Sequence, residues 1–344
     1  TGSTSGDITL AGTTTALDLV TMTTASGSIN GSGLVTSGTV DLNASTGIGN
    51  TTGVTLSSSN ITADTTTGDI EIASSLGTAV SVSSLTTGAG AIGLAQSGGG
   101  DLSTGTVSAS GAVVLSNSAG SISLAGIVTS VSLDATASGA ITDGSDGDLT
   151  ITGLAEFTAG NIELGNAAGN ATNFGTLTFN SAGSVNVSEA SSMFVSGSST
   201  AGAGLELVST GGVTLNASVT VVGDTSILAG AISGGITVNA KLNGSGTILL
   251  DSAGEITIDA AIDPTTVTLN ADDDITVNSA VVASELITVS AGEDGSGSFA
   301  LGVAGSLETT DSGSDITVTT GSTSGDITLA GTTTALDLVT MTTA

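Results

Sequence analysis

The chain has 344 residues, of which 52 are Gly and five are Phe, and it contains no Trp, Tyr, Cys or His. A compact core of this size usually depends on aromatic side chains, and without Cys or His the chain lacks disulfides, the usual zinc ligands and the base of a nucleophilic triad. The 31 acidic residues face one base, Lys241, and the net charge of −30 makes nucleic acid and anionic membrane surfaces poor partners.

Hydrophobic residues make up 38% of the chain and recur at short, regular intervals. A disordered segment lacks such a burial pattern, so we expect a folded chain. The longest strictly apolar runs, 112–115 and 280–283, are four residues long. A membrane-spanning helix needs about 20 such residues. We therefore expect no membrane span.

The first predicted element along the chain is the core Gly6-Asp7-Ile8-Thr9-Leu10, in which apolar and polar residues alternate. This alternation predicts a short, half-buried strand, and the bordering Gly and Asp are typical of turns. Related cores recur down the chain at 68–72, 120–124, 147–151, 254–258, 274–277 and 315–318. The sequence therefore predicts many short strands and no helical periodicity.

The strand cores are commonly spaced near 10 or near 20 residues, which predicts rungs of roughly 20 residues with two or three strands each. Tandem sandwich domains are the main alternative. They would repeat near 100 residues and usually carry a core Trp or a Tyr corner, and neither feature is present. We predict an all-β parallel β-helix, or β-solenoid, that is continuous over residues 1–344.

An acidic loop follows in chain order, where Asp143, Asp146 and Asp148 lie close together among Gly residues. Carboxylate oxygens are the ligands that Ca²⁺ prefers, although the spacing does not match the EF-hand pattern. These three residues are our candidate metal ligands. A solvated acidic turn is the alternative interpretation. No cofactor is required, and divalent cations are the one ligand class that the composition suggests.

Catalytic chemistry finds little support in the sequence. Polysaccharide lyases built on β-helices usually need a basic residue, and the only candidate, Lys241, lies in a turn-like Asn-Ala-Lys-Leu-Asn stretch. A two-carboxylate glycosidase would lack aromatic sugar platforms. Thr-x-Thr segments of the kind used by ice-binding β-helices do not recur at a fixed spacing. We predict a non-enzymatic protein without catalytic residues, and keep ice-binding and polysaccharide-active β-helices as less favoured alternatives.

The longest repeat closes the chain, because residues 320–344 are identical to residues 1–25. The chain therefore holds one complete long repeat, 1–319, and the opening segment of the next, 320–344. We expect a window onto a longer array of near-identical repeats; the alternative is a shorter protein with duplicated ends. In both cases the predicted partners are further copies of the chain, joined in tandem, head to tail or laterally.

The GDITL-type cores, the Thr-Thr-Thr-Ala turn at 13–16 and the Gly/Ser/Thr/Asn-rich alternation resemble filamentous-haemagglutinin-type β-solenoids and giant repeat-bearing bacterial surface proteins. This resemblance implies a right-handed parallel β-helix, export to the cell surface and a role in adhesion or matrix building. We accordingly expect a structural shaft of an extracellular bacterial filament, sheath or matrix fibre. The alternative is the stalk of a large adhesin whose binding region lies elsewhere.

Overall fold

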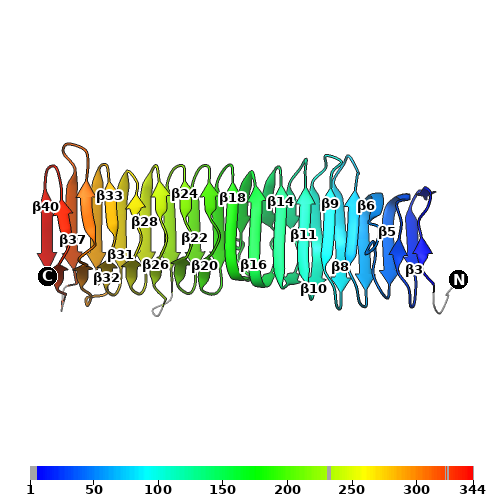
Figure 1. The fold of residues 1–344 in the computed structure, drawn as a ribbon, viewed down its shortest axis with the longest axis horizontal. Coiled ribbons are helices and arrows are strands. Elements are labelled where there is room, and N and C mark those ends of the chain that lie inside the picture. Colours follow the sequence, from blue (N-terminus) through cyan, green and yellow to red (C-terminus); the bar gives the residue numbers. More distant parts are fainter. Residues whose placement is uncertain (1–5, 231–233, 322, 324, 344) are drawn as a thin grey trace. The chain divides into compact units, whose positions relative to one another are not determined.

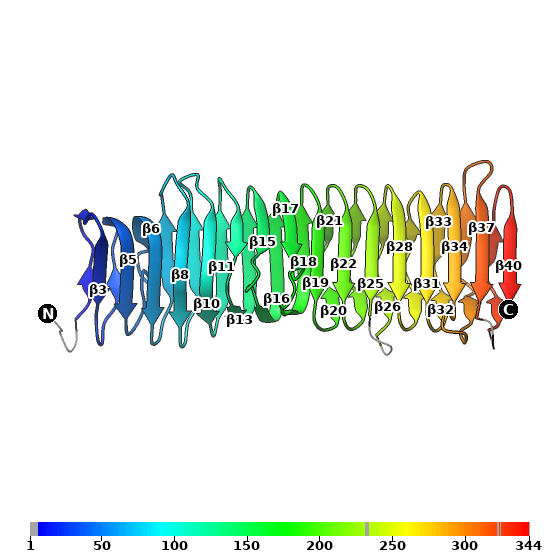
Figure 2. The ribbon, with the colours of Figure 1, turned by 180° about the vertical axis from the view of Figure 1, so that it is seen from behind.

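The computed structural model describes residues 6–230, 234–321, 323 and 325–343. In this part of the chain there is no helix, 59% of the residues are in strands, and successive rungs lie about 21 residues apart. The chain divides into two compact units, Thr1–Gly175 and Thr176–Ala344. Each unit is a stack of parallel strands wound as a β-solenoid (Figures 1 and 2), so the predicted fold class is confirmed.

The first unit is built from strands of two to twelve residues that all pair in parallel. Its strands are β1 (Ile8–Thr9), β2 (Thr14–Thr15), β3 (Leu19–Thr23), β4 (Ile29–Asn30), β5 (Leu34–Ala44), β6 (Val54–Thr65), β7 (Ile70–Ser74), β8 (Val80–Thr87), β9 (Ile92–Gln96), β10 (Leu102–Ala109), β11 (Ala112–Asn117), β12 (Ile122–Leu124), β13 (Val128–Ser130), β14 (Ser132–Ala137), β15 (Ala140–Asp143), β16 (Leu149–Ala159) and β17 (Asn161–Leu164). The division between the units falls within β18 (Thr172–Ser181).

The second unit continues with shorter, more regular strands, three to a turn. They are β19 (Val185–Glu189), β20 (Met193–Val195), β21 (Ser199–Ala201), β22 (Leu205–Ser209), β23 (Val213–Leu215), β24 (Val219–Val221), β25 (Thr225–Ala229), β26 (Ile236–Val238), β27 (Leu242–Gly244), β28 (Thr247–Ser252), β29 (Ile256–Ile258), β30 (Ile262–Asp263), β31 (Thr266–Ala271), β32 (Ile275–Val277), β33 (Ala280–Ala283), β34 (Leu286–Ala291), β35 (Phe299–Leu301), β36 (Ser306–Thr309), β37 (Asp315–Thr320), β38 (Ile327–Leu329), β39 (Thr332–Thr334) and β40 (Val339–Thr343).

The core of each unit consists of aliphatic columns that run from turn to turn. In the first unit one column contains isoleucine at five successive turns, because the strand register aligns Ile8, Ile29, Ile48, Ile70 and Ile92. The last four are at most 1% exposed. The period-2 pattern of the sequence produces this arrangement, since alternate residues of each strand point inward and the outward ones can be polar.

The strand register is kept even where the turn length changes. In the second unit Val267 is aligned with Ile287, and Ile287 is in turn aligned with Ile316 across a longer stretch of chain. The additional residues lie in the segments between β34 and β37, outside the long first strand of the turn. Loop length therefore varies while the buried columns remain unbroken, which explains why the sequence spacing looks irregular.

Short polar residues shape the corners between strands. The Ser252 hydroxyl accepts the Gly254 N–H at 3.1 Å and donates to the Glu255 carbonyl at 3.3 Å, and Ser209 makes the equivalent pair of bonds at its own corner. Gly68 adopts φ +88°, and a Cβ there would lie 2.1 Å from the carbonyl oxygen of Thr46 in the preceding turn. Only glycine fits this corner.

Candidate functional site

The most regular polar feature of the molecule is an aspartate that links one turn to the next. In each case the aspartate directly precedes the first inward residue of a strand, and its carboxylate accepts the backbone N–H at the equivalent position of the next turn. We call this contact an aspartate clasp. Over the described residues the donor–acceptor distances are 2.7 to 3.2 Å, and the pairs are Asp7–Ser28, Asp69–Ala91, Asp101–Ser121, Asp148–Ala171, Asp224–Thr247, Asp274–Ser298 and Asp315–Leu338.

The clasp lies where a connecting loop meets the start of a strand, at the point where the regular hydrogen bonds between strands begin. A hydrogen bond to an ionised carboxylate is stronger than one between neutral groups, so the clasp fixes the register at this border. Asp7 also accepts the Ser28 hydroxyl at 2.9 Å, and these two bonds lower the pKa of Asp7. The sequence identified several of these aspartates only as turn formers. The signal that could have revealed the clasp is their fixed place, one residue before an inward Ile, Leu or Thr.

The segment that occurs twice in the sequence forms a turn in each unit. In the first unit residues 6–24 pair with the turn that follows, where Ile8 is aligned with Ile29 and Val20 with Val40. In this copy, the segment therefore pairs with the next turn of the solenoid.

In the second unit the identical residues 325–343 pair with the turn that precedes them. Ile327 is aligned with Phe299 and Val339 with Ile316. One sequence is thus seen with a partner turn on one face in its first copy and on the opposite face in its second copy. The two registers together define how this segment fits between two turns.

The acidic loop places its three aspartates in different surroundings. Asp143 accepts the Gly165 N–H at 2.6 Å and the Asn170 side-chain amide at 3.0 Å, while Asp148 forms a clasp with Ala171. Burial raises the pKa of Asp143 and outweighs these hydrogen bonds, which lower it. Asp143 and Asp148 are therefore both engaged in contacts that organise the loop.

Asp146 and Asp148 line a hollow of about 630 Å³ together with Asn170. Over the residues that the structure describes, no group of three or more His, Cys, Asp or Glu side chains is arranged to hold a metal ion. Asp143 and Asp148 instead form hydrogen bonds within the protein. Calcium binding by this loop stays a prediction.

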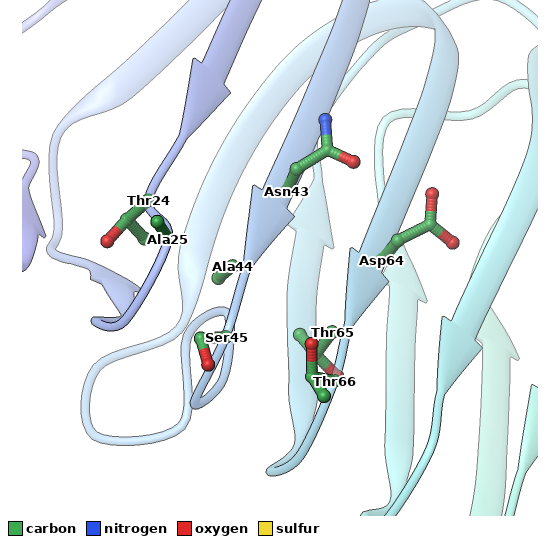
Figure 3. Close-up of a pocket in the computed structure, with 8 residues that line it drawn as sticks. All are labelled: Thr24, Ala25, Asn43, Ala44, Ser45, Asp64, Thr65 and Thr66. Atoms are coloured by element: carbon green, nitrogen blue, oxygen red, sulfur yellow. The ribbon is translucent and has the colours of Figure 1, made fainter. Parts of the chain in front are cut away.

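A second hollow, of about 310 Å³, lies at the ends of β3, β5 and β6 (Figure 3). Its wall is polar, with Asn43 and Asp64 on neighbouring strands and with threonine hydroxyls below them. The Asn43 amide donates to Asp41 at 2.9 Å, and the Thr86 hydroxyl donates to Asp64. The first bond lies within β5, and the second links β8 to β6 of the preceding turn.

A third hollow, of about 520 Å³, lies in the second unit, where Val185, Leu205 and Leu249 line it together with polar residues. Two of those polar residues bond to each other, since the Asn186 amide donates to Glu206 at 2.9 Å.

Lys241, the only base, is exposed just before β27, and its backbone carbonyl accepts the Val219 N–H at 3.0 Å.

The second unit also carries an outward polar ladder that spacing in the sequence did not reveal. The register aligns one threonine from each of four successive turns, at Thr214, Thr237, Thr257 and Thr276. Slightly further along each turn, two pairs of polar side chains bond between adjacent turns. Asn239 donates to Asn216 at 3.0 Å, and Asn278 donates to Asp259 at 2.8 Å. Variable loop lengths hide this alignment in the sequence.

Comparison with models of known protein families, with curated proteins and with solved structures gives no match for this chain. Within the part of the chain that the structure describes, no helix is long and apolar enough to cross a membrane. The fold and its contacts between turns are therefore the basis for assigning a role.

Proposed function

We propose that the chain is a non-enzymatic structural segment, the shaft of an extracellular bacterial filament, sheath or matrix fibre in which repeat follows repeat. The observation that carries this proposal is the pairing of the shared segment. Its first copy, residues 6–24, pairs with the turn that follows it, and its second copy, residues 325–343, pairs with the turn that precedes it. A segment that can lie between two turns can pass the strand ladder from one repeat to the next.

The apolar columns support continuity across such a junction. Val339 lies on the column of Ile316, and its identical counterpart Val20 lies on the column of Val40. Joined through the shared segment, these two columns become one. The same holds for the column of Phe299 and Ile327, which continues through Ile8 to Ile29. Repeats joined in this way need no change of register.

The energetics of a solenoid favour a shaft over a compact functional domain. Each turn is stabilised chiefly by its two neighbours, so stability is collective along the stack. The aspartate clasps add a directional bond at many of these steps. The high negative charge keeps separate shafts soluble and apart, and divalent cations could bridge them. Cohesion along the shaft and repulsion between shafts are the properties that a single extended fibre requires.

Immunogold electron microscopy of the producing cells tests the proposal. Antibodies raised against the 344-residue chain are expected to label filaments or a sheath outside the cell at regular axial positions. Label confined to the cell interior would contradict the proposed location. Beads coated with the same chain are expected to show no adhesion of their own; specific receptor binding by the chain would instead favour a role as the binding part of an adhesin.

A further inference from the structure

The hollow of about 520 Å³ in the second unit extends along the stack of turns. The residues that line it come from four successive turns, at 184–186, 204–206, 224–226, and 247 and 249. Three steps at the strand spacing of ~4.8 Å give it a length of about 14 Å. Its volume lies in the range of small-molecule sites. The hollow therefore fits a narrow, extended small molecule.

The missing side chain of Gly204 leaves open space in this hollow. A Cβ at Gly204 would have the carbonyl oxygen of Asp224 as its nearest neighbour, at 3.6 Å, which is an ordinary contact distance. Gly204 is also not one of the glycines with positive φ. Neither close packing nor backbone conformation requires glycine here, so a larger residue can be placed at this position to fill the hollow.

The hollow combines an apolar lining with two carboxylates. Val185, Leu205 and Leu249 form the apolar part, and Glu206 and Asp224 are exposed beside it. The strand register sets the two acidic residues on adjacent turns as diagonal neighbours. At the usual strand spacing and rise per residue, their Cα atoms lie about 8 Å apart. The lining therefore suits a ligand with apolar segments and more than one positive charge.

Two further oxygens at the hollow have no hydrogen-bond partner among the described residues. Thr225 lines the hollow and is 2% exposed, and its hydroxyl is unpartnered. The side-chain oxygen of Asn186 is also buried and unpartnered, although the Asn186 amide donates to Glu206 at 2.9 Å. Buried polar atoms in folded proteins usually have a partner. These two oxygens therefore point to a ligand that donates hydrogen bonds.

We propose that this hollow binds a linear aliphatic polyamine. The ammonium groups of the ligand pair with the carboxylates of Glu206 and Asp224. They also donate hydrogen bonds to the unpartnered oxygens of Asn186 and Thr225, while the methylene segments lie against the apolar lining. The net charge of −30 attracts such a cation from a distance. This binding site goes beyond the structural role of the shaft and does not depend on it.

The lining favours a polyamine over the other cations that an acidic chain attracts. A divalent metal ion needs several converging oxygen ligands, and within the described residues no group of three or more His, Cys, Asp or Glu is arranged to hold one. A hydrated ion also gains nothing from apolar side chains. A single ammonium group can pair closely with only one of two carboxylates whose Cα atoms are about 8 Å apart.

Isothermal titration calorimetry of the full chain with spermidine tests the proposal. Negative charge gathers polyamines over the whole surface, so the first comparison uses variants of equal charge. Spermidine is expected to fill one saturable site that weakens roughly tenfold or more in Gly204→Val. Gly53→Val is the matched control, because Gly53 also directly precedes the first inward residue of a strand and has open space around it. Equal affinity in the two variants would overturn the proposal.

A second pair of substitutions changes only exposed side chains, so it stays informative if Gly204→Val fails to fold. Glu206→Gln removes one charge at the hollow and should weaken spermidine binding about tenfold. Glu308→Gln removes one charge from another exposed position of the second unit and should leave the affinity nearly unchanged. Equal losses in the two variants would show that only the overall charge matters and would refute a defined site.

A third comparison distinguishes a free polyamine from the lysine side chain of a partner protein. Nα-acetyl-lysine amide has one ammonium group on an aliphatic stem. It is expected to bind roughly tenfold or more weakly than spermidine, because it can pair with only one of the two carboxylates. Equal affinity for the two compounds would overturn the assignment of a polyamine and would indicate a site for a lysine side chain.

Discussion

The carboxylate of Asp7 accepts two hydrogen bonds from Ser28, from its backbone N–H at 2.8 Å and from its hydroxyl at 2.9 Å. The two residues are 21 positions apart and lie on adjacent turns. This relationship recurs along both units as the aspartate clasp. Several of the acidic residues that give the chain its charge therefore also tie one turn to the next.

Removing one clasp should destabilise the solenoid locally. Asp274 is exposed and accepts the Ser298 N–H at 2.7 Å, so Asp274→Ala should lower the free energy of unfolding by about 1 kcal/mol. Asp273→Ala is the matched control, because Asp273 is also exposed and carries the same charge but forms none of the clasps seen in the described residues. Urea unfolding followed by circular dichroism compares them, and equal losses would show that only charge matters.

A truncation in a buried column should be more costly. Ile70 is fully buried between Ile48 and Ile92, so Ile70→Ala should lower the free energy of unfolding by about 2–5 kcal/mol. Hydrogen exchange should rise chiefly in the turns that contact residue 70, since stability passes between nearest neighbours. Ile127→Ala, at a position 52% exposed, should have little effect. Similar losses for both variants would argue against a core of stacked columns.

Glu71 should destabilise the fold at neutral pH. Its side chain lies over Gly93 of the next turn, and burial together with the negative charge of Asp69 raises its pKa. The ionised form is therefore less favourable in the folded chain than in the unfolded chain. This penalty is present above the folded-state pKa and is relieved as the pH falls through it.

We therefore expect Glu71→Gln to raise the melting temperature at pH 7. The difference from the unsubstituted chain should narrow as the pH approaches 4.5, the ordinary glutamate value. Glu163→Gln, on the outward side of β17, removes one negative charge elsewhere and serves as the control. A gain from Glu71→Gln that persists unchanged at acidic pH would contradict this explanation.

The acidic loop allows a test that distinguishes structural from metal-binding roles. Asp143→Ala should lower the free energy of unfolding by about 1–3 kcal/mol, because the partly buried Gly165 N–H and Asn170 amide lose their acceptor. The loss should be the same with EDTA as with calcium if these bonds account for it.

The calcium hypothesis predicts a different result for the same loop. Calorimetric titration should then find one saturable Ca²⁺ site that disappears in Asp146→Asn, a substitution that keeps the side-chain shape and leaves the bonds of Asp143 and Asp148 in place. Calcium uptake that does not change in this variant would contradict binding at the loop and favour the solvated turn.

Much of the fold could be predicted because the chemistry is local. The alternation in cores such as 68–72 and 254–258 is sufficient to form strands, and those segments form β7 and β29. The absence of aromatic residues suitable for a sandwich core, together with the close and recurrent spacing of the strand cores, indicated a solenoid. The rung length and the parallel register followed from the same pattern.

The contacts between turns were harder to predict because they depend on register. Loop lengths change the spacing from turn to turn, since the aligned pair Thr214 and Thr237 is 23 positions apart and the aligned pair Thr257 and Thr276 is 19 apart. The sequence therefore does not reveal that these threonines lie side by side. The clasp of Asp274 likewise joins residues 24 positions apart. For Asp143, the charge pattern predicted a candidate calcium ligand but gave no sign of its hydrogen bonds to the Gly165 N–H and the Asn170 amide, which lie 22 and 27 positions away.

Electron microscopy of a covalent two-copy chain, compared with the 344-residue chain, tests most directly whether turns continue across the repeat. If they do, the additional repeat should lengthen the particle by ~75 Å, with an axial spacing near ~4.8 Å in the power spectrum. Two separate beads on a flexible link, or an added length unrelated to the turn spacing, would contradict a continuous shaft.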